Sequence, residues 1–335
     1  MIWLTWRQHR IEILIMGLIL LAIAAVLLAT GLHIEAEARN ITICLSRHTD
    51  CLAEQAALDN YINQLTGNAS FLVLGAALPV LAGIFIGAPV IARELEQGTH
   101  HMIWTQGISW QRWLLIRLGF LFCVVLCSFG ILFGLLTWWS ILAAGAAKGN
   151  WSIDFSTHFD GWGVVLIAYA LFALLLGIFA GTVLRRTVPA MAVTLIIFVL
   201  VRVLIVNFGR PYFFPPMTMT TPANSGLQIP AGAWIFNIAL VDRQGHPLPD
   251  DALQACENLL SSVPPTNAEQ AQYDHCITEH GFQYKATYQP ADRFWPLQGI
   301  ESSIYLFLTF ILFALTFWWI KYRIIGNTVR FSLED

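Results

Sequence analysis

The chain has 335 residues, of which 57% are hydrophobic and only 12% are charged, and its formal net charge is −3. A soluble domain carries roughly 25% charged residues because its surface must stay hydrated. Together with a mean hydropathy of +0.63, this composition excludes a soluble globular protein and predicts a chain that crosses a lipid bilayer several times.

The first predicted element lies at the membrane surface. Residues 1–10 are too polar to span a bilayer, but they combine aromatic and basic side chains. These side chains are Trp3, Trp6, Arg7, His9 and Arg10. Indole rings and cations both favour the headgroup layer. We therefore expect a short interfacial helix before the first span.

Six apolar runs follow, each long enough to cross a bilayer. A helix needs about 20 apolar residues to cross roughly 30 Å of hydrocarbon. The runs are 11–32, 70–92, 113–143, 161–184, 187–208 and 303–320. They predict an all-α polytopic membrane protein. The third run exceeds one span, so it either projects beyond the bilayer or breaks near Gly130 or Gly134.

A segment of about 90 residues separates the fifth and sixth predicted spans, far more than a tight connection requires. Its first part, 211–240, is rich in proline and apolar residues and is compatible with a dip back into the membrane. Its second part, 241–295, is polar and acidic and resembles a small folded cap closed by a disulfide. The predicted division is 1–208 for the interfacial helix and spans one to five, 209–300 for the cap, and 301–335 for the last span and tail.

Charges beside the spans predict the orientation. Ten of the 18 basic residues fall on the side that both termini share, while most acidic residues fall on the opposite side. Because basic residues are enriched on the cytoplasmic side, we expect both termini in the cytoplasm of a bacterial cell and the cap outside its plasma membrane.

Cysteine placement agrees with this orientation. Four cysteines lie in the predicted outer segments, where an oxidising environment favours disulfides. We expect the pairs Cys44–Cys51 and Cys256–Cys276, with unpaired exposed thiols as the alternative. Two others, Cys123 and Cys127, lie within the third span and are expected to pack as small apolar residues.

The connection between the second and third spans, 92–119, is the most informative segment. It opens with charged residues and a glycine and continues with apolar and aromatic ones: Arg93, Glu94, Glu96, Gly98, Met102, Ile103 and Trp104. Ser109 is a suitable N-cap for the next helix. An apolar patch rimmed by polar groups indicates partner docking. A loop held at the membrane surface by Trp104, Trp110 and Trp113 is an equal alternative.

These features together resemble the membrane subunits of type-2 ABC exporters. The resemblance is sharpest at LTWRQHR, residues 4–10, and at ARELEQGTHHMIWTQGISWQRWLL, residues 92–115. It implies that loop 93–112 carries a coupling helix that docks into a separate ATPase subunit. The implied coupling residues are Glu94, Glu96, Gly98, Thr99, His100, Trp104, Thr105 and Gln106. It also places Arg7, His9 and Arg10 in a connecting helix at the membrane surface.

The chain carries no G-x-x-x-x-G-K-[ST] phosphate loop. We therefore expect a transport subunit rather than an enzyme, with no cofactor, metal or nucleic acid bound to it. The resemblance implies that ATP and magnesium are bound by the partner ATPase, and that a second permease subunit, identical or similar, completes the path across the lipid bilayer. A hydrophobic or amphipathic substrate is favoured. The alternatives are a membrane sensor or assembly factor whose cap binds a ligand and, third, an intramembrane enzyme.

Three further features have competing interpretations. Arg202 lies inside the fifth span, where a charge is costly and indicates function, but its position near the outer surface favours snorkelling toward Arg210. Gly177 and Gly181 form a G-x-x-x-G motif, which serves packing within one subunit or dimerisation equally well.

The third feature is a group of potential metal ligands in the cap, namely Asp274, His275, Cys276 and His280. A disulfide at Cys276 with solvated histidines is favoured over a metal site. We expect no buried acidic pair in the spans, which argues against an intramembrane hydrolase and an ion pump driven by carboxylates.

Overall fold

A computed structural model of the chain describes residues 2–47, 51–67, 77–97, 110–146, 159–161, 163–223, 229–230, 232–246, 248, 254, 256–260 and 266–325. The chain divides into two compact units. The first combines Met1–Ile153, Thr157–Arg210 and Trp295–Asp335, and the second combines Asp154–Ser156 with Pro211–Phe294. The second unit is shorter than the predicted cap, 209–300, because the last helix already begins at Phe294, ahead of its fully apolar part.

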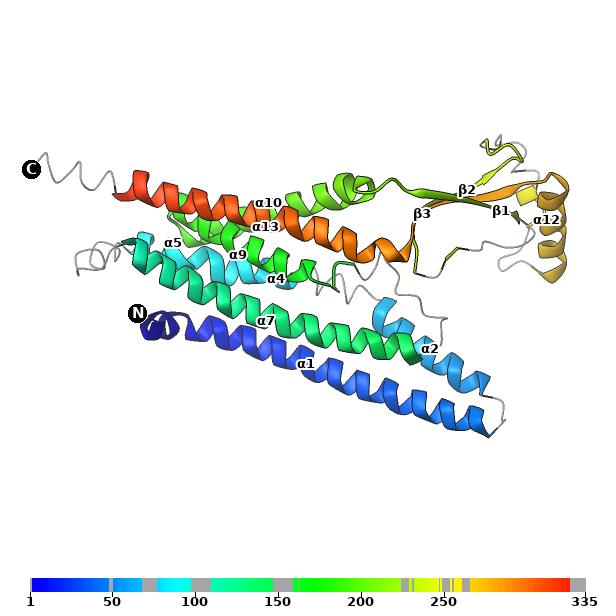
Figure 1. The fold of residues 1–335 in the computed structure, drawn as a ribbon, viewed down its shortest axis with the longest axis horizontal. Helices are drawn as coiled ribbons and strands as arrows, with labels where there is room; N and C mark the ends of the chain where they lie inside the picture. The colour runs from blue at the N-terminus through cyan, green and yellow to red at the C-terminus, as the bar shows by residue number, and fades with distance from the viewer. Residues whose placement is uncertain are drawn as a thin grey trace, which may run out of the picture. The chain divides into compact units, whose positions relative to one another are not determined.

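The first unit is a bundle of long helices (Figure 1). Its elements are α1 (Ile2–Ser46), α2 (Leu52–Gly67), α4 (Leu78–Ala82), the π-helical η2 (Gly83–Gly87), α5 (Ala88–Glu96), α7 (Trp110–Ala146), α9 (Val165–Leu184), α10 (Thr187–Leu204), η3 (Ile205–Gly209), η4 (Arg210–Tyr212), α13 (Phe294–Trp319) and η7 (Ile320–Ile325). Helix α1 begins at the same end of the bundle at which α5 and α9 finish. We call this end the N-terminal end of the bundle.

Six helical segments among the described residues are long and apolar enough to cross a membrane. They are Arg10–Ser46, Leu78–Glu96, Gln111–Ala143, Val165–Leu184, Thr187–Tyr212 and Ala291–Arg323. Each overlaps one predicted run, so the all-α polytopic fold is confirmed. The segments extend past several of the predicted bounds because helices continue beyond the fully apolar residues.

Two helices are longer than expected. We predicted a surface helix, a span and a polar segment at the start of the chain, but α1 is one helix of 45 residues. No glycine or proline follows Gly31 before its end, and the residues there favour a helix. Its first turns, in the darkest blue, bend aside from the rest (Figure 1). Likewise, α7 runs unbroken through Gly130 and Gly134, so the third run projects beyond one span.

The core of the first unit centres on α9. In the most apolar 18-residue stretch of this helix, 89% of the residues are buried. Two of its glycines permit the close approach of a neighbouring helix. A Cβ atom at Gly177 would overlap the carbonyl oxygen of Gly83, and one at Gly181 would overlap that of Ala88. The G-x-x-x-G motif therefore packs α9 against η2 and α5 of the same chain. Of its two interpretations, the structure supports packing within one subunit rather than dimerisation.

Helices α1 and α2 pack with α7 on the other side of the core. The predicted disulfide between Cys44 and Cys51 is present and joins the end of α1 to the start of α2. This bond holds α2 against α1, where Leu58 and Ile62 are buried.

The second unit is a small α+β fold. Its three-stranded antiparallel sheet has the order β1-β3-β2, with β1 at Met217–Pro222, β2 at Trp234–Val241 and β3 at Gln283–Gln289. Strand β1 and all of β2 except Val241 lie in segment 211–240, which we considered for a dip into the membrane. Alternating threonine and methionine in β1, and aromatic and β-branched residues in β2, favour strands instead.

A helix and a disulfide complete this unit. Helix α12 (Asn267–Glu279) begins with a capping box between Thr266 and Glu269. The predicted disulfide between Cys256 and Cys276 is present, and it packs with Ile277 in a small apolar core. The cap predicted from sequence is therefore a folded unit stapled by a disulfide.

Candidate functional site

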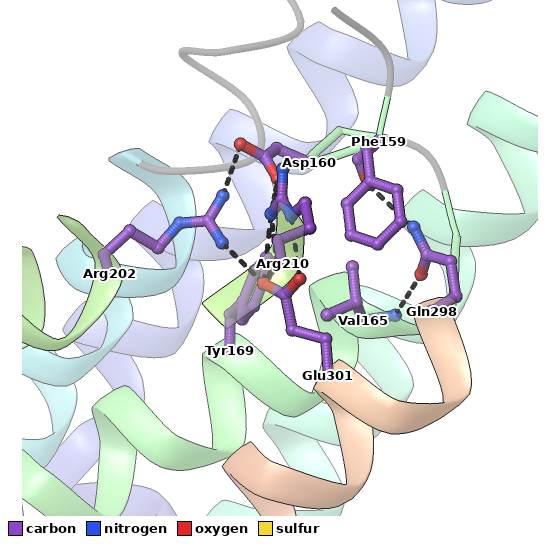
Figure 2. A network of polar contacts seen from close by, with 8 residues as sticks. All are labelled: Phe159, Asp160, Val165, Tyr169, Arg202, Arg210, Gln298 and Glu301. Atoms are coloured by element: carbon purple, nitrogen blue, oxygen red, sulfur yellow. Dashed lines mark hydrogen bonds and ion pairs between the residues drawn. The ribbon is translucent and has the colours of Figure 1, made fainter. Parts of the chain in front are cut away.

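Four charged side chains are buried together in the first unit, at the end of the bundle opposite its N-terminal end. Asp160 lies in the turn before α9, Arg202 on α10, Arg210 on η4 and Glu301 on α13 (Figure 2). Their exposed fractions are 7%, 7%, 3% and 0% respectively. We refer to these four residues as the charge quartet.

Each arginine of the quartet bridges both carboxylates. Arg202 Nη2 lies 2.6 Å from Asp160 Oδ2, and its Nη1 lies 3.2 Å from Glu301 Oε1. Arg210 Nη2 lies 2.6 Å from Asp160 Oδ1, and its Nε lies 2.9 Å from Glu301 Oε2. The result is a closed ring of alternating charges with no net charge. Such balance is what permits charges to be withdrawn from water, since an isolated buried charge is very costly.

Aromatic groups cover the ring. The Tyr169 hydroxyl donates to Glu301 Oε1 at 2.5 Å, and the Arg202 guanidinium stacks over the Tyr169 ring at 4.0 Å from its centroid. Arg210 stacks in the same way over Phe159 at 4.1 Å. Burial alone would raise the pKa of Asp160, but the two arginines hold it below its usual value, so the carboxylate stays ionised.

A neutral side chain extends the network beside the quartet. Gln298 of α13 accepts a hydrogen bond from the Val165 backbone N–H at 3.0 Å and donates one to the Phe159 carbonyl at 2.8 Å. Gly163 has a φ of +125°, and a Cβ atom there would overlap the Gln298 amide. Together, Gln298 and the quartet fasten α10 and α13 to the start of α9.

The quartet corrects one expectation from the sequence. We favoured a snorkelling Arg202, but Arg202 turns inward and is paired. Its partners Asp160 and Glu301 lie just outside the predicted spans 161–184 and 303–320, and both are buried. The error arose because Asp160 lies in a polar connection and Glu301 precedes a fully apolar run, so composition placed both outside. The available signal was Arg202 itself, because a cation inside a span requires a counter-ion.

At the N-terminal end of the bundle, the last turn of α5 is tied to three other helices. Arg93 Nη1 pairs with Glu12 Oε1 of α1 at 2.9 Å. Glu94, which is 8% exposed, pairs with the buried Arg117 of α7. The α5 segment thus enters the predicted coupling loop with its position fixed on two sides.

The third tie of α5 is made to α10. Glu96 Oε2 accepts hydrogen bonds from the backbone N–H of Thr187 at 3.2 Å and from its hydroxyl at 2.9 Å. Thr187 is the first residue of α10, where a negative charge is favoured by the unpaired N–H groups of the helix. We refer to the three contacts that hold α5 as the α5 brace.

The structure describes some of the predicted site residues and not others. Glu94 and Glu96 belong to the α5 brace, and their carboxylates face other helices of the same chain. The remaining coupling residues lie outside the described residues: Gly98, Thr99, His100, Trp104, Thr105 and Gln106. Arg7 and Arg10 are exposed on α1, whose backbone also includes Trp3, Trp6 and His9.

The potential metal ligands of the second unit have another role. Cys256, Cys276 and His280 lie close together, but the two sulfur atoms are bonded to each other. A metal would require their thiolates. His280 Nδ1 lies 2.8 Å from the Cys276 carbonyl oxygen, an ordinary hydrogen bond at the end of α12.

Six helices long and apolar enough to cross a membrane, among the residues that the structure describes, define a multi-pass membrane component. A family model described as "ABC-2 membrane transporter related" matches residues 16–210, and the chain belongs to this family. This match confirms the resemblance to type-2 ABC permease subunits. The matched region contains the α5 brace apart from Glu12, and three of the four quartet residues. Searches of curated proteins and of solved structures gave no match.

Proposed function

We propose that this chain is the membrane subunit of an ABC exporter, working with a second permease subunit and a separate ATPase that binds ATP and magnesium. The observation that supports this most directly is the α5 brace. It fixes the helix that leads into residues 98–106, where the family resemblance places the ATPase contact. In this proposal Trp104 and its neighbours touch the ATPase, while Glu94 and Glu96 position the helix behind them.

The brace suggests how motion would pass from the ATPase into the membrane. Because Glu94 and Arg117 are both buried, breaking their ion pair would cost several kcal/mol. Helices α5 and α7 therefore move together when the coupling loop is pushed. At the opposite end, the charge quartet keeps α9, α10 and α13 together. Connections at both ends favour rocking of the bundle as a rigid body between inward- and outward-open states.

Replacing Trp104 with alanine is expected to weaken ATPase binding about 30-fold, the effect of losing a typical tryptophan hot spot. The measurement is co-purification of the intact chain with candidate ATPases, followed by titration. Trp318→Ala is the matched control, since Trp318 is half exposed on α13 and lies outside the loop. A wild-type chain that retains no ATPase, or equal retention by both variants, would contradict the proposal and favour a sensor.

The proposed orientation places both termini and the α5 brace in the cytoplasm and the second unit outside the plasma membrane. It predicts that an impermeant maleimide labels His275→Cys on intact cells, and labels Gln97→Cys only after permeabilisation. Both positions are exposed in the structure. The background is a chain with Cys123 and Cys127 replaced by serine, because these are its free thiols among the described residues. The reverse labelling pattern would overturn the orientation.

A further inference from the structure

An apolar groove opens between α1 and the helix formed by α4, η2 and α5. Its volume is about 280 Å³, and its described lining is apolar apart from Glu12 and Arg93. Phe129 of α7 and Met191 of α10 contribute from the neighbouring helices. All of these residues belong to the first unit, and none belongs to the charge quartet.

The groove has a polar end and an apolar end. Glu12 and Arg93 form their ion pair near the N-terminal end of the bundle, where α1 enters its spanning segment. Leu78 lies 15 residues before Arg93 along nearly continuous helix, which corresponds to about 22 Å. Half of a bilayer core is about 15 Å thick. The groove therefore extends from the headgroup layer into the middle of the membrane, which is the path of one acyl chain.

The charges at the polar end are suited to a phosphate group. The side chain of Arg93 is 53% exposed, whereas that of Glu12 is only 14% exposed. A guanidinium has five N–H donors in a planar fork and binds phosphate oxygens in pairs. Arg93 therefore keeps N–H donors exposed at the groove lining although one of its nitrogens is paired with Glu12. Arg10, Arg185 and Arg186 are also exposed at this end of the bundle and add positive charge.

The backbone at the middle of the groove supports a binding role independently. The wall there is η2, a π-helix, and such segments recur at functional sites. Gly83 and Gly87 face α9, where a Cβ atom would overlap the carbonyl oxygens of Ala173 and Leu174. Phe85, between these glycines, is 56% exposed and lines the groove. The glycines allow this helix to pack closely against α9, and the large aromatic side chain of Phe85 remains available to a ligand.

We propose that this groove binds an anionic phospholipid, with one acyl chain along the apolar wall and the phosphate on Arg93. The lipid comes from the leaflet at the N-terminal end of the bundle, which the proposed orientation makes the inner one. Lipid binding requires neither the ATPase nor transport, so a test of this site gives the same result whether or not the proposed function is correct.

The test is lipid retention by the purified full chain, measured by native mass spectrometry. The probes are phosphatidylglycerol and phosphatidylethanolamine with identical acyl chains. We expect a preference of about fivefold for phosphatidylglycerol, the size of effect of one cation near an anionic membrane surface. Arg93→Gln should abolish this preference, and Leu81→Trp, which fills the groove, should reduce retention of both lipids. Equal retention of the two lipids by the wild type would overturn the proposal.

Three further variants separate binding from a structural effect. Glu12→Gln breaks the same ion pair but keeps the guanidinium, so the preference for phosphatidylglycerol should persist. If Glu12→Gln loses it as Arg93→Gln does, the loss is structural and the assignment of Arg93 is wrong. Arg39→Gln, at a side chain of α1 that is 69% exposed and outside the groove, is the control for charge, and Ile131→Trp, on an exposed part of α7 outside the groove, is the control for bulk. Retention by Leu81→Trp equal to that by Ile131→Trp would also overturn the proposal.

Discussion

Replacing Glu301 with glutamine is expected to lower the free energy of unfolding of the helical bundle by about 3 to 5 kcal/mol, the cost of breaking a buried ion pair. Glu301 is fully buried and accepts hydrogen bonds from Tyr169, Arg202 and Arg210. The glutamine keeps the size of the side chain but removes one of two negative charges. Two buried arginines then share a single carboxylate, that of Asp160.

A second substitution distinguishes charge balance from loss of contacts. Combining Glu301→Gln with Arg202→Met restores neutrality and should recover a large part of the lost stability, because paired removal of buried charges is tolerated. Thermal unfolding of the purified chain in detergent measures both variants. Glu279→Gln is the matched control, since this carboxylate is 71% exposed on α12. A melting temperature for Glu301→Gln equal to that of the control would contradict the buried quartet.

Replacing Gly177 with alanine is expected to destabilise the bundle by about 3 kcal/mol, the upper range for overpacking a core. A Cβ atom there would meet backbone atoms of Gly83, Gly87 and Ala88. Backbone atoms cannot turn aside as a flexible side chain does, so α9 and the η2–α5 helix would have to separate. Most of the groove wall opposite α1 would move with them.

The control for Gly177 is another helical glycine in open surroundings. A Cβ atom at Gly134 of α7 would meet no atom of another described helix within 4 Å. Gly134→Ala should therefore be neutral or stabilising by up to about 1 kcal/mol, the difference in helix propensity. Unfolding of the two variants under identical conditions provides the comparison. If both alanines were tolerated equally, the close packing of α9 against η2 would be wrong.

Sequence was sufficient where the relevant information is local or compositional. The six spans follow from apolar length, because the hydrocarbon thickness sets how many residues a helix needs. Both disulfides join cysteines within one connecting segment, so spacing and compartment were enough to pair Cys44 with Cys51 and Cys256 with Cys276. The R-E-x-E pattern at Arg93–Glu96 indicated the family, although its carboxylates proved to contact other helices.

Features that depend on distant residues were not predictable in this way. Arg202 and Glu301 are separated by 99 positions. A hydropathy profile counts the free-energy cost of each charge in the membrane separately, so it does not detect that the two charges form an ion pair. The α5 brace has the same character, since Arg93 and Glu12 are 81 positions apart. Strands β1 and β2 were missed for another reason. Their apolar residues suggested membrane contact, whereas pairing with β3 decides their structure.

The burial of α9 limits which parts of the bundle can contact other molecules. A helix enclosed on nearly every side has little surface to offer a lipid or a second subunit. Open faces lie on other helices, such as α10 and α13, where Ile196 and Phe310 are each more than 60% exposed. Surface substitutions on these helices can therefore alter intermolecular contacts while the central helix stays unchanged.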